Sequence, residues 1–244
     1  MIRVCVSGAR GRMGRMLIDL VQAASDLTLA SALERQGHPE LGLELGSAHL
    51  TDDAGAAIEA ADVLLDFALP EAVIEHLEPA VLHAKPVVTG TTGLGDDQQA
   101  AIDIAAKRIA LVVASNMSRG IHLLSKLTAL AAEALPGYDA EIFEIHHKNK
   151  VDSPSGTALQ LAGILSEKQS YGRQAKRQTG EVGLSAARGG DVVGEHQVMF
   201  LGPGEQLILT HRATSREHFC QGALEAVRFA AGSAPGRYSM ADVF

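Results

Sequence analysis

Residues 2–14 read IRVCVSGARGRMG, and this stretch decides the fold. Its first half, Ile2–Ser7, is a short apolar run with β-branched residues, which predicts a buried strand. Gly8 ends the run, and the apolar residues of 12–24 then recur at helical spacing. The stretch therefore predicts a strand, a glycine turn and a helix, the first unit of a parallel sheet covered by helices.

The same alternation continues through the first half of the chain. Four further apolar runs predict strands, at 27–33, 63–68, 86–89 and 109–114, and helical stretches at 71–84 and 96–108 separate the later ones. Near-continuous apolar strands with helices between them are typical of a parallel sheet that is buried on both faces. We therefore expect an α/β domain here.

After Asn116 the pattern becomes that of an α+β domain. The expected elements are a helix over 119–135, a strand over 139–147, a helix from about 155, and strands over 192–201 and 206–213. The last two strands are joined by Gly202-Pro203-Gly204, a turn that predicts antiparallel pairing. A final helix over 216–231, with Ser215 as a candidate cap, could pack on either domain.

The composition is that of a globular protein of one or two domains. The chain has 244 residues, of which 46% are hydrophobic and 20% charged. A net charge of −8 argues against broad attraction to nucleic acid or to an anionic membrane. No apolar run approaches the roughly 18 residues of a membrane span.

The two cysteines indicate the redox setting. Cys5 and Cys220 form no CxxC pair, so we expect neither a disulfide framework nor a zinc site. We expect a reducing, cytoplasmic setting instead.

The glycines of the first turn predict an anion site. Gly8, Gly11 and Gly14 have the spacing GxxGxxG and lie where a helix begins. Backbone amides at a helix N-terminus can hold a pyrophosphate, and glycine lets the phosphates approach the main chain. The alternative is a glycine turn that serves packing alone.

Glu34 favours a dinucleotide at this turn. It follows the second strand, 20 residues after Gly14, where a carboxylate accepts hydrogen bonds from an adenosine ribose. Arg35 comes next and could pair with a 2′-phosphate, whereas Glu34 would repel one, so we expect both NADH and NADPH to be accepted. The alternative is a solvated Glu-Arg pair at a strand end.

Two more loops follow strands at the same edge of the sheet. Residues 90–93 read GTTG and residues 114–117 read ASNM, and both are candidate walls of a nicotinamide pocket, although either could be an ordinary turn. The predicted cofactor-binding residues are Gly8, Ala9, Arg10, Gly11, Arg12, Met13, Glu34, Arg35, Gly90, Thr91, Thr92, Ala114, Ser115, Asn116 and Met117.

A basic cluster stands in the second half, where residues 141–158 read EIFEIHHKNKVDSPSGTA. His146, His147, Lys148 and Lys150 come just before the small residues of 154–157, which begin a helix. A histidine and a lysine beside free helix amides suit proton transfer to an anionic substrate. The alternative is a solvated loop with one packed histidine. No HExxH or comparable spacing appears, so we predict no metal site.

These motifs together resemble one family. The stretches GARGRMG, ALER, GTTG, SNMSRG, EIHHKNKVDSPSGTA, GDVVGEHQVMF and LTHRATSREHF are similar to those of the 4-hydroxy-tetrahydrodipicolinate reductase family, formerly called dihydrodipicolinate reductase. The resemblance implies a Rossmann-type dinucleotide-binding domain over 1–117, to which 216–244 returns. It also implies an α+β substrate-binding and tetramerisation domain over 118–215, and a cytoplasmic homotetramer.

The resemblance also implies a reaction and its residues. Members reduce a cyclic dicarboxylate with NADH or NADPH on the diaminopimelate route to lysine. By motif, His146 resembles the proton donor or acceptor and Lys150 the proton donor, while His147, Gly156 and Thr157 resemble substrate contacts. Ala68 and Met117 depart from the family pattern, where Thr and Phe are usual.

Two other functions are compatible with a dinucleotide-binding chain. One is another two-domain NAD(P)-dependent dehydrogenase of amino-acid metabolism, which would need a different anion arrangement after the fifth strand. The other is a non-catalytic redox sensor that reports dinucleotide to a partner. A sensor should lack the histidine and lysine cluster or carry a basic DNA-binding helix, and this acidic chain does neither.

Overall fold

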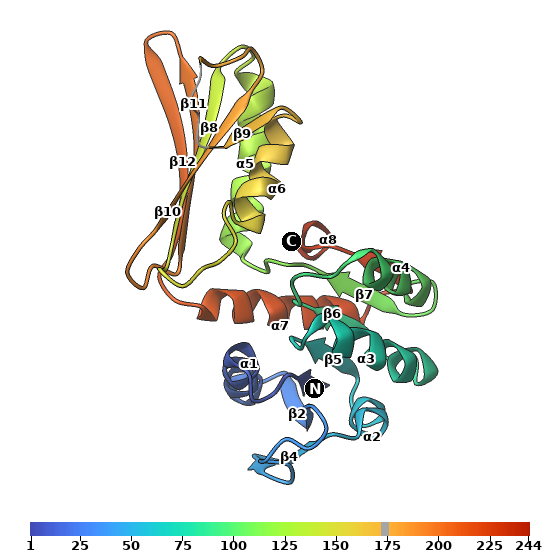
Figure 1. Cartoon of the computed structure of the whole chain (residues 1–244). Helices are drawn as coiled ribbons and strands as arrows, with labels where there is room; N and C mark the ends of the chain where they lie inside the picture. The colour runs from blue at the N-terminus through green and yellow to red at the C-terminus, as the bar shows by residue number, and fades with distance from the viewer. Residues whose placement is uncertain (172–175) are drawn as a thin grey trace. The chain divides into compact units, whose positions relative to one another are not determined.

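The computed structural model describes residues 1–171 and 176–244, and these form two compact units (Figure 1). The first unit comprises Met1–Met117 and Phe219–Phe244, and the second comprises Ser118–His218. Each unit is built on its own sheet. The expected fold class is confirmed, since a largely parallel sheet with helices is accompanied by a second α+β unit.

The sheet of the first unit has the strand order β13-β7-β6-β5-β1-β2-β4-β3. Its strands are β1 (Ile2–Ser7), β2 (Leu27–Leu33), β3 (Glu44–Leu45), β4 (Ala48–Thr51), β5 (Val63–Asp66), β6 (Val87–Thr89), β7 (Ala110–Val113) and β13 (Gly236–Tyr238). Its helices are α1 (Arg12–Ala23), α2 (Ala54–Glu59), α3 (Pro70–Leu82), α4 (Asp96–Ala105), α7 (Glu217–Ala231) and α8 (Met240–Val243). All pairs are parallel except β3–β4.

A hydrophobic core lies on each face of this sheet. Val4 and Val6 of β1 point into one core, where they meet α1 and α7, whereas Cys5 points into the other with α2, α3 and α4. Alternate residues of a strand face opposite sides, so a strand buried on both sides must be apolar throughout. This is why the continuous apolar runs of the sequence are strands here.

Helix α7 belongs to the first core although it comes after the second unit in the chain. A Cβ on Gly222 would lie 1.7 Å from the carbonyl oxygen of Met117, so only glycine allows this approach. Cys220 of α7 and Cys5 of β1 are both fully buried. Within the described residues, the helices are all too short or too polar to cross a membrane.

The second unit has a sheet of strand order β12-β11-β8-β10-β9. Its strands are β8 (Asp139–His146), β9 (Gln169–Tyr171), β10 (Val182–Arg188), β11 (Gly194–Gly202) and β12 (Glu205–Ala213), and its helices are α5 (Arg119–Ala134) and α6 (Gly156–Leu165). The antiparallel pair predicted from the Gly202-Pro203-Gly204 turn is confirmed as β11–β12. Strands β9 and β10 were not predicted; β10 lies between β8 and β9 and pairs parallel with both.

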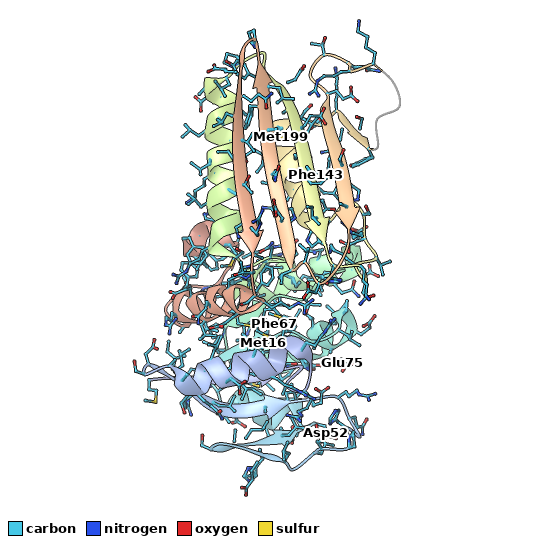
Figure 2. The ribbon with its side chains drawn as sticks, turned by 90° about the vertical axis from the view of Figure 1, so that its left-hand side faces the viewer. Met16, Asp52, Phe67, Glu75, Phe143 and Met199 are labelled. Atoms are coloured by element: carbon cyan, nitrogen blue, oxygen red, sulfur yellow. The ribbon has the colours of Figure 1, made fainter. Side chains whose placement is uncertain are left out.

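Helices α5 and α6 cover one face of the second sheet (Figure 1). Along β8 the residues alternate, so that Ile142, Glu144 and His146 are buried on the helix side while Phe143 and Ile145 lie on the opposite side. Figure 2 shows Phe143 and Met199 on this opposite side, in front of the sheet, with the helices behind it. Strand alternation thus places a carboxylate and an imidazole together in the layer under the helices.

Candidate functional site

The glycine turn brings the start of α1 close to the end of β1. Gly8 has a φ of +68°, and a Cβ there would lie 2.7 Å from the carbonyl oxygen of Phe67. A Cβ on Gly14 would lie 2.1 Å from the carbonyl oxygen of Gly8. Gly11 is the exposed cap residue directly before α1, and as a glycine it has no side chain that could cap the first amides of the helix. The first amides of a helix have no partner within it, so the start of α1 could hold the anion that the spacing predicts.

A cavity of about 610 Å³ lies beside this turn. Four predicted cofactor residues line it, namely Gly8, Gly11, Glu34 and Arg35. Three titratable residues that sequence reasoning missed also line it, namely Asp52, Glu75 and His76. Figure 2 labels Asp52 and Glu75 in this unit. The cavity opens at the carboxyl ends of the parallel strands, where ligands bind in folds of this kind.

Glu34 is held by main-chain donors at the end of β2. Its two carboxylate oxygens accept the N–H groups of Arg10 and Arg35, each at 3.1 Å. The guanidinium of Arg10 turns instead to Glu40, in a bidentate pair at 2.5 and 3.0 Å. This pair lowers the pKa of Glu40 from its ordinary value. Glu34 is thus placed to accept ribose hydroxyls, while the charge of Arg10 is already matched.

A buried polar group fixes the turn after β5. The fully buried Asp66 accepts the N–H of Ala68 at 3.0 Å, and its other oxygen lies 2.8 Å from Nδ1 of His76. The hydrogen bond to Ala68 explains why β5 ends at Asp66, two residues before the expected end of the strand. Asp66 was not predicted because it falls within an apolar run that otherwise has the pattern of a core strand.

A second cavity of about 290 Å³ is enclosed by the two loops that were candidate nicotinamide walls. Of the predicted residues, Met13, Gly90, Thr91, Thr92, Ala114, Ser115 and Met117 line it. Phe67, Ala68 and Phe219 complete the wall, and none of these was predicted. Thr91 donates its hydroxyl to the carbonyl oxygen of Ala68 at 3.0 Å, which ties the loop after β6 to the turn after β5.

Four predicted cofactor residues line neither cavity. They are Ala9, which is fully buried, Arg10, Arg12 and Asn116. The remaining donors nevertheless suit a dinucleotide, because free helix amides, a fixed carboxylate and an adjoining smaller cavity lie along one edge of the sheet. The helix amides suit a phosphate, the carboxylate of Glu34 suits a ribose, and the smaller cavity suits a flat ring.

The predicted substrate residues lie together in the second unit. His146 ends β8, and Lys150 follows in the loop, where its ammonium nitrogen lies 2.8 Å from Oδ1 of Asp152. Burial opposes ionisation of Asp152, but Lys150 outweighs it, and the pKa of Asp152 is lowered. The basic cluster is thus partly matched by an acidic residue whose role the sequence did not predict.

The start of α6 lies in the same unit. Ser155 is the cap, and its hydroxyl accepts the N–H of Ala158 at 3.2 Å. Gly156 is exposed and Thr157 is half-buried at the first turn. Because the first amides of a helix have no partner within the helix and carry partial positive charge, this end of α6 favours a carboxylate.

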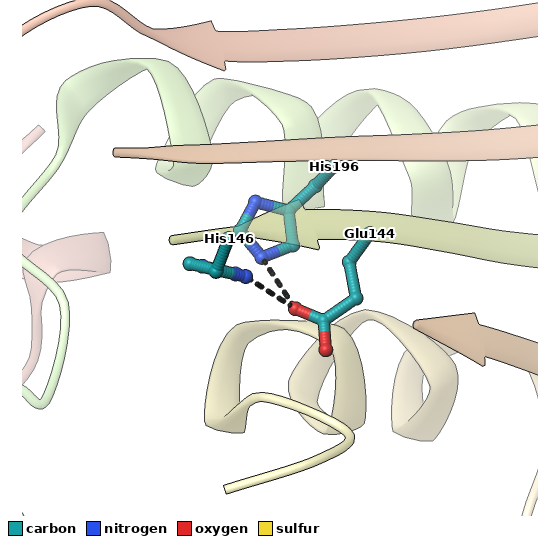
Figure 3. A group of neighbouring side chains, drawn as sticks. All are labelled: Glu144, His146 and His196. Carbon is teal, nitrogen blue, oxygen red and sulfur yellow. Dashed lines mark ion pairs between the residues drawn. The ribbon is translucent and has the colours of Figure 1, made fainter. Parts of the chain in front are cut away.

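Beneath these residues lies a buried cluster of Glu144, His146 and His196 (Figure 3). Oε2 of Glu144 lies 2.7 Å from Nδ1 of His146 and 3.8 Å from Nε2 of His196. Oε1 of Glu144 accepts the N–H of Ser155 at 2.8 Å and a guanidinium N–H of Arg188 at 3.0 Å. Sequence reasoning missed Glu144, although the two-residue period of a strand places it beside His146.

The surroundings decide the charge of this cluster. Burial alone would raise the pKa of Glu144, but His146, Ser155 and Arg188 together hold it well below its usual range. Burial, with the nearby His146, lowers the pKa of His196 to about 4. The cluster therefore contains an ionised carboxylate and, at neutral pH, an uncharged His196.

The same three side chains are of the types that bind a divalent metal ion. Two ligands on a tetrahedral zinc ion with bonds of about 2.0–2.1 Å would lie about 3.3 Å apart, farther than the 2.7 Å between Glu144 and His146. Arg188 also brings a positive charge to within 3.0 Å of the carboxylate. These contacts favour a hydrogen-bonding and proton-transfer role over a metal site.

Two family models match the chain. The model described as "Dihydrodipicolinate reductase, N-terminus" matches residues 2–117, and the one described as "Dihydrodipicolinate reductase, C-terminus" matches residues 120–244. Together they cover almost all of both units.

Relatives and solved structures agree with these models. The chain is 43% identical to a 4-hydroxy-tetrahydrodipicolinate reductase of Burkholderia thailandensis, over 99% of this chain and 97% of the relative. It is 44% identical to that of Thiobacillus denitrificans, over 99% and 98%. The dipicolinate-bound dihydrodipicolinate reductase from Paenisporosarcina sp. TG-14 superimposes with a TM-score of 0.81 at 26% identity, over 99% and 98% of the two chains.

Proposed function

The chain belongs to the dihydrodipicolinate reductase family, and we propose that it reduces 4-hydroxy-tetrahydrodipicolinate to tetrahydrodipicolinate with NADH or NADPH. This reaction lies on the diaminopimelate route to lysine. One observation supports the proposal most directly: His146, Lys150 and the start of α6 lie in one unit, whose sequence has the family's motif. The first unit supplies the glycine turn and the Glu34 carboxylate that a dinucleotide requires.

We assign the coenzyme to the two cavities of the first unit. The amides of α1 would hold the pyrophosphate, Glu34 the adenosine ribose, and the smaller cavity the nicotinamide. When bound, the reduced nicotinamide supplies the hydride. Thr91 and Met117 would position the ring, and Ala68 leaves this wall without the threonine that is usual in the family.

We assign the substrate to the loop after β8 and the start of α6. A cyclic dicarboxylate presents two anionic groups, and the amides of Gly156 and Thr157 would hold one of them. Lys150 and His147 would hold the other, with Lys150 released from Asp152 when the substrate binds. The dipicolinate named for the Paenisporosarcina structure is a ligand of this dicarboxylate class.

Proton transfer completes the reaction. Adding a hydride to a conjugated C=C/C=N system leaves negative charge on the ring, which a nearby acid must quench. We assign Lys150 as the proton donor and His146 as a donor or acceptor beside it, because both lie at the end of β8 next to the carboxylate-binding amides. The reaction further requires that the substrate held by this segment reach the hydride-bearing ring.

An assay with fresh substrate tests the proposed function. Oxidation of NADH or NADPH is followed after 4-hydroxy-tetrahydrodipicolinate is generated in place, with amino-acid semialdehydes as competing substrates. Turnover with the cyclic dicarboxylate alone is expected. Turnover only with a semialdehyde would favour another dehydrogenase of amino-acid metabolism, and tight coenzyme binding without turnover of either would favour a redox sensor.

We further propose a cytoplasmic homotetramer. The side of the second sheet opposite α5 and α6 carries Phe143, Ile145, Met199, Leu201 and Ile208, and no described helix lies over it. An uncovered apolar sheet face of this kind favours burial against other copies of the chain. Both cysteines, Cys5 and Cys220, are buried, and buried cysteines are compatible with a reducing compartment.

A further inference from the structure

The carboxylate of Glu144 connects two parts of the proposed substrate site. One oxygen accepts the N–H of Ser155, the cap residue directly before Gly156 and Thr157. The other oxygen faces Nδ1 of His146 at 2.7 Å. A single side chain from β8 therefore contacts both the start of α6 and the imidazole of the proposed proton-transfer residue.

The carboxylate is fixed by its surroundings. It is 1% exposed, and Arg188 of β10 donates to the same oxygen as Ser155, at 3.0 Å. Arg188 also donates to the carbonyl oxygen of Asp152 at 2.6 Å, so it links Glu144 to the loop that carries Lys150. The other oxygen of Glu144, Oε2, is buried and accepts no hydrogen bond, so its contact with His146 is an ion-pair distance of 2.7 Å.

His196 closes the cluster from β11. Its ring lies edge-on to that of His146, with centroids 5.0 Å apart, and its Nε2 lies 3.2 Å from the hydroxyl of Ser155. That hydroxyl already accepts the N–H of Ala158, so its own proton is available for Nε2 of an uncharged His196. Because its pKa is lowered to about 4, His196 brings no positive charge to Glu144 at neutral pH.

We propose that Glu144 is a positioning residue that holds the proton of His146 on Nδ1 and thereby directs Nε2 to proton exchange with the substrate. A carboxylate accepts but cannot donate, so the ring nitrogen that faces it must carry a proton. The same carboxylate orients the amides at the start of α6. Glu144 thus sets the relative position of the substrate's carboxylate site and its proton-transfer group.

This inference rests on the proposed function and is tested with Glu144→Gln. The glutamine keeps an oxygen for Ser155, so the KM for the dicarboxylate should stay within about threefold. Its amide would donate to Nδ1, move the imidazole proton to Nε2, and lower kcat by about 10²-fold.

Glu141→Gln is the matched control. Glu141 lies on the same strand but on the opposite side of the sheet, where it pairs with Arg177. Its kcat and KM should match those of the parent within about twofold. Equal losses in the two variants, or an unchanged kcat in Glu144→Gln, would overturn the proposal.

A measurement on the unaltered chain needs neither folding of a variant nor turnover. In protein labelled with ¹⁵N-histidine, the neutral His146 should carry its proton on Nδ1, with dipicolinate absent and present. A proton on Nε2 in both states would overturn the proposal. If the parent does not reduce the substrate, the proposed function fails, yet the Nδ1 proton would still establish what Glu144 does to His146.

Discussion

Lys150 provides the most direct prediction at the scale of a single residue. Lys150→Ala removes the proposed proton donor and should lower kcat by about 10²- to 10³-fold, while NADH binding measured by fluorescence titration stays unchanged. Lys148→Ala is the control, since Lys148 lies two residues away with an exposed side chain. Unchanged turnover in Lys150→Ala would exclude the assigned role.

The pair formed by Arg10 and Glu40 predicts a change in coenzyme preference. Glu40 neutralises the guanidinium of Arg10, and the main-chain N–H of Arg10 donates to Glu34, the proposed ribose-binding residue. Glu40→Gln should release that charge for a 2′-phosphate and raise the ratio of kcat/KM for NADPH to that for NADH by about fivefold or more. The same substitution in an Arg10→Met background should leave the ratio unchanged. An equal rise in both backgrounds would contradict this explanation.

His196 predicts a loss of stability in acid. Its pKa is lowered to about 4 by burial and by His146, against about 6.5 in the unfolded chain. The unfolded chain therefore binds more protons between these values, so stability is fully present above about pH 6.5 and falls toward pH 4, by up to about 3 kcal/mol.

Urea unfolding at pH 7 and pH 5 measures this effect at fixed protein concentration. His196→Gln removes the titrating group and should make the difference between the two pH values smaller. His49→Gln, which alters an exposed histidine, should leave the difference as in the parent. A pH dependence that is the same in all three proteins would place the acid sensitivity elsewhere.

The site residues that the sequence led us to predict are those whose proposed role depends on local pattern. The glycine turn, Glu34 and the basic segment each follow from spacing within one strand-turn-helix unit. Asp52 of the first unit and Arg188 of the second did not emerge, because each is placed by the pairing of strands that are distant in sequence. Glu75 lies on helix α3 and was missed as well. A residue's neighbours across a sheet depend on register, which one strand alone does not reveal.

At the scale of the element, α7 is the helix whose placement the sequence left open. The structure settles its packing through Gly222, which lies against the carbonyl oxygen of Met117 at the end of the first unit's main segment. The apolar face of α7 has the period of a helix that could pack on either domain. The residue that decides between them is Gly222, because it fits against the main chain of the first unit.

Gly222→Ala should therefore destabilise the protein. The added Cβ would meet the Met117 carbonyl at 1.7 Å, so backbone must move, and the free energy of unfolding should fall by about 2 kcal/mol or more. Gly232→Ala is the control, because no atom lies within 4 Å of a Cβ there. Chemical denaturation of both variants measures the difference, and similar midpoints would show that α7 adjusts without strain.

Among the elements, long apolar runs were predicted and short polar strands were not. Strands β1 and β2 lie where their sequences placed them. The short pair β3–β4 and strand β10 were missed, since β3 has only two residues and the residues that β10 adds to the sheet include glycine, serine and alanine. Such strands form because neighbouring strands pair with them, and not because their own residues have a high β-strand propensity.

At the scale of the whole molecule, the uncovered side of the second sheet predicts the assembly. Met199 lies near the middle of β11, paired with Ile208 of β12 on one side and Glu141 of β8 on the other. Met199→Arg would bring a charge into the proposed interface and should convert tetramers to smaller species in light scattering. Leu130→Arg, on the exposed side of α5, should leave the mass unchanged. A parent that is monomeric would refute the proposed tetramer.

Both native thiols are sealed inside the first unit, and burial raises the pKa of Cys5 to about 12. Maleimide dyes react with thiolates, so they should not label these two cysteines while the protein is folded. A cysteine introduced on the surface of each unit could then be labelled without first deleting the native pair. Energy transfer between such dyes would report, in solution and during turnover, whether the distance between the two units changes.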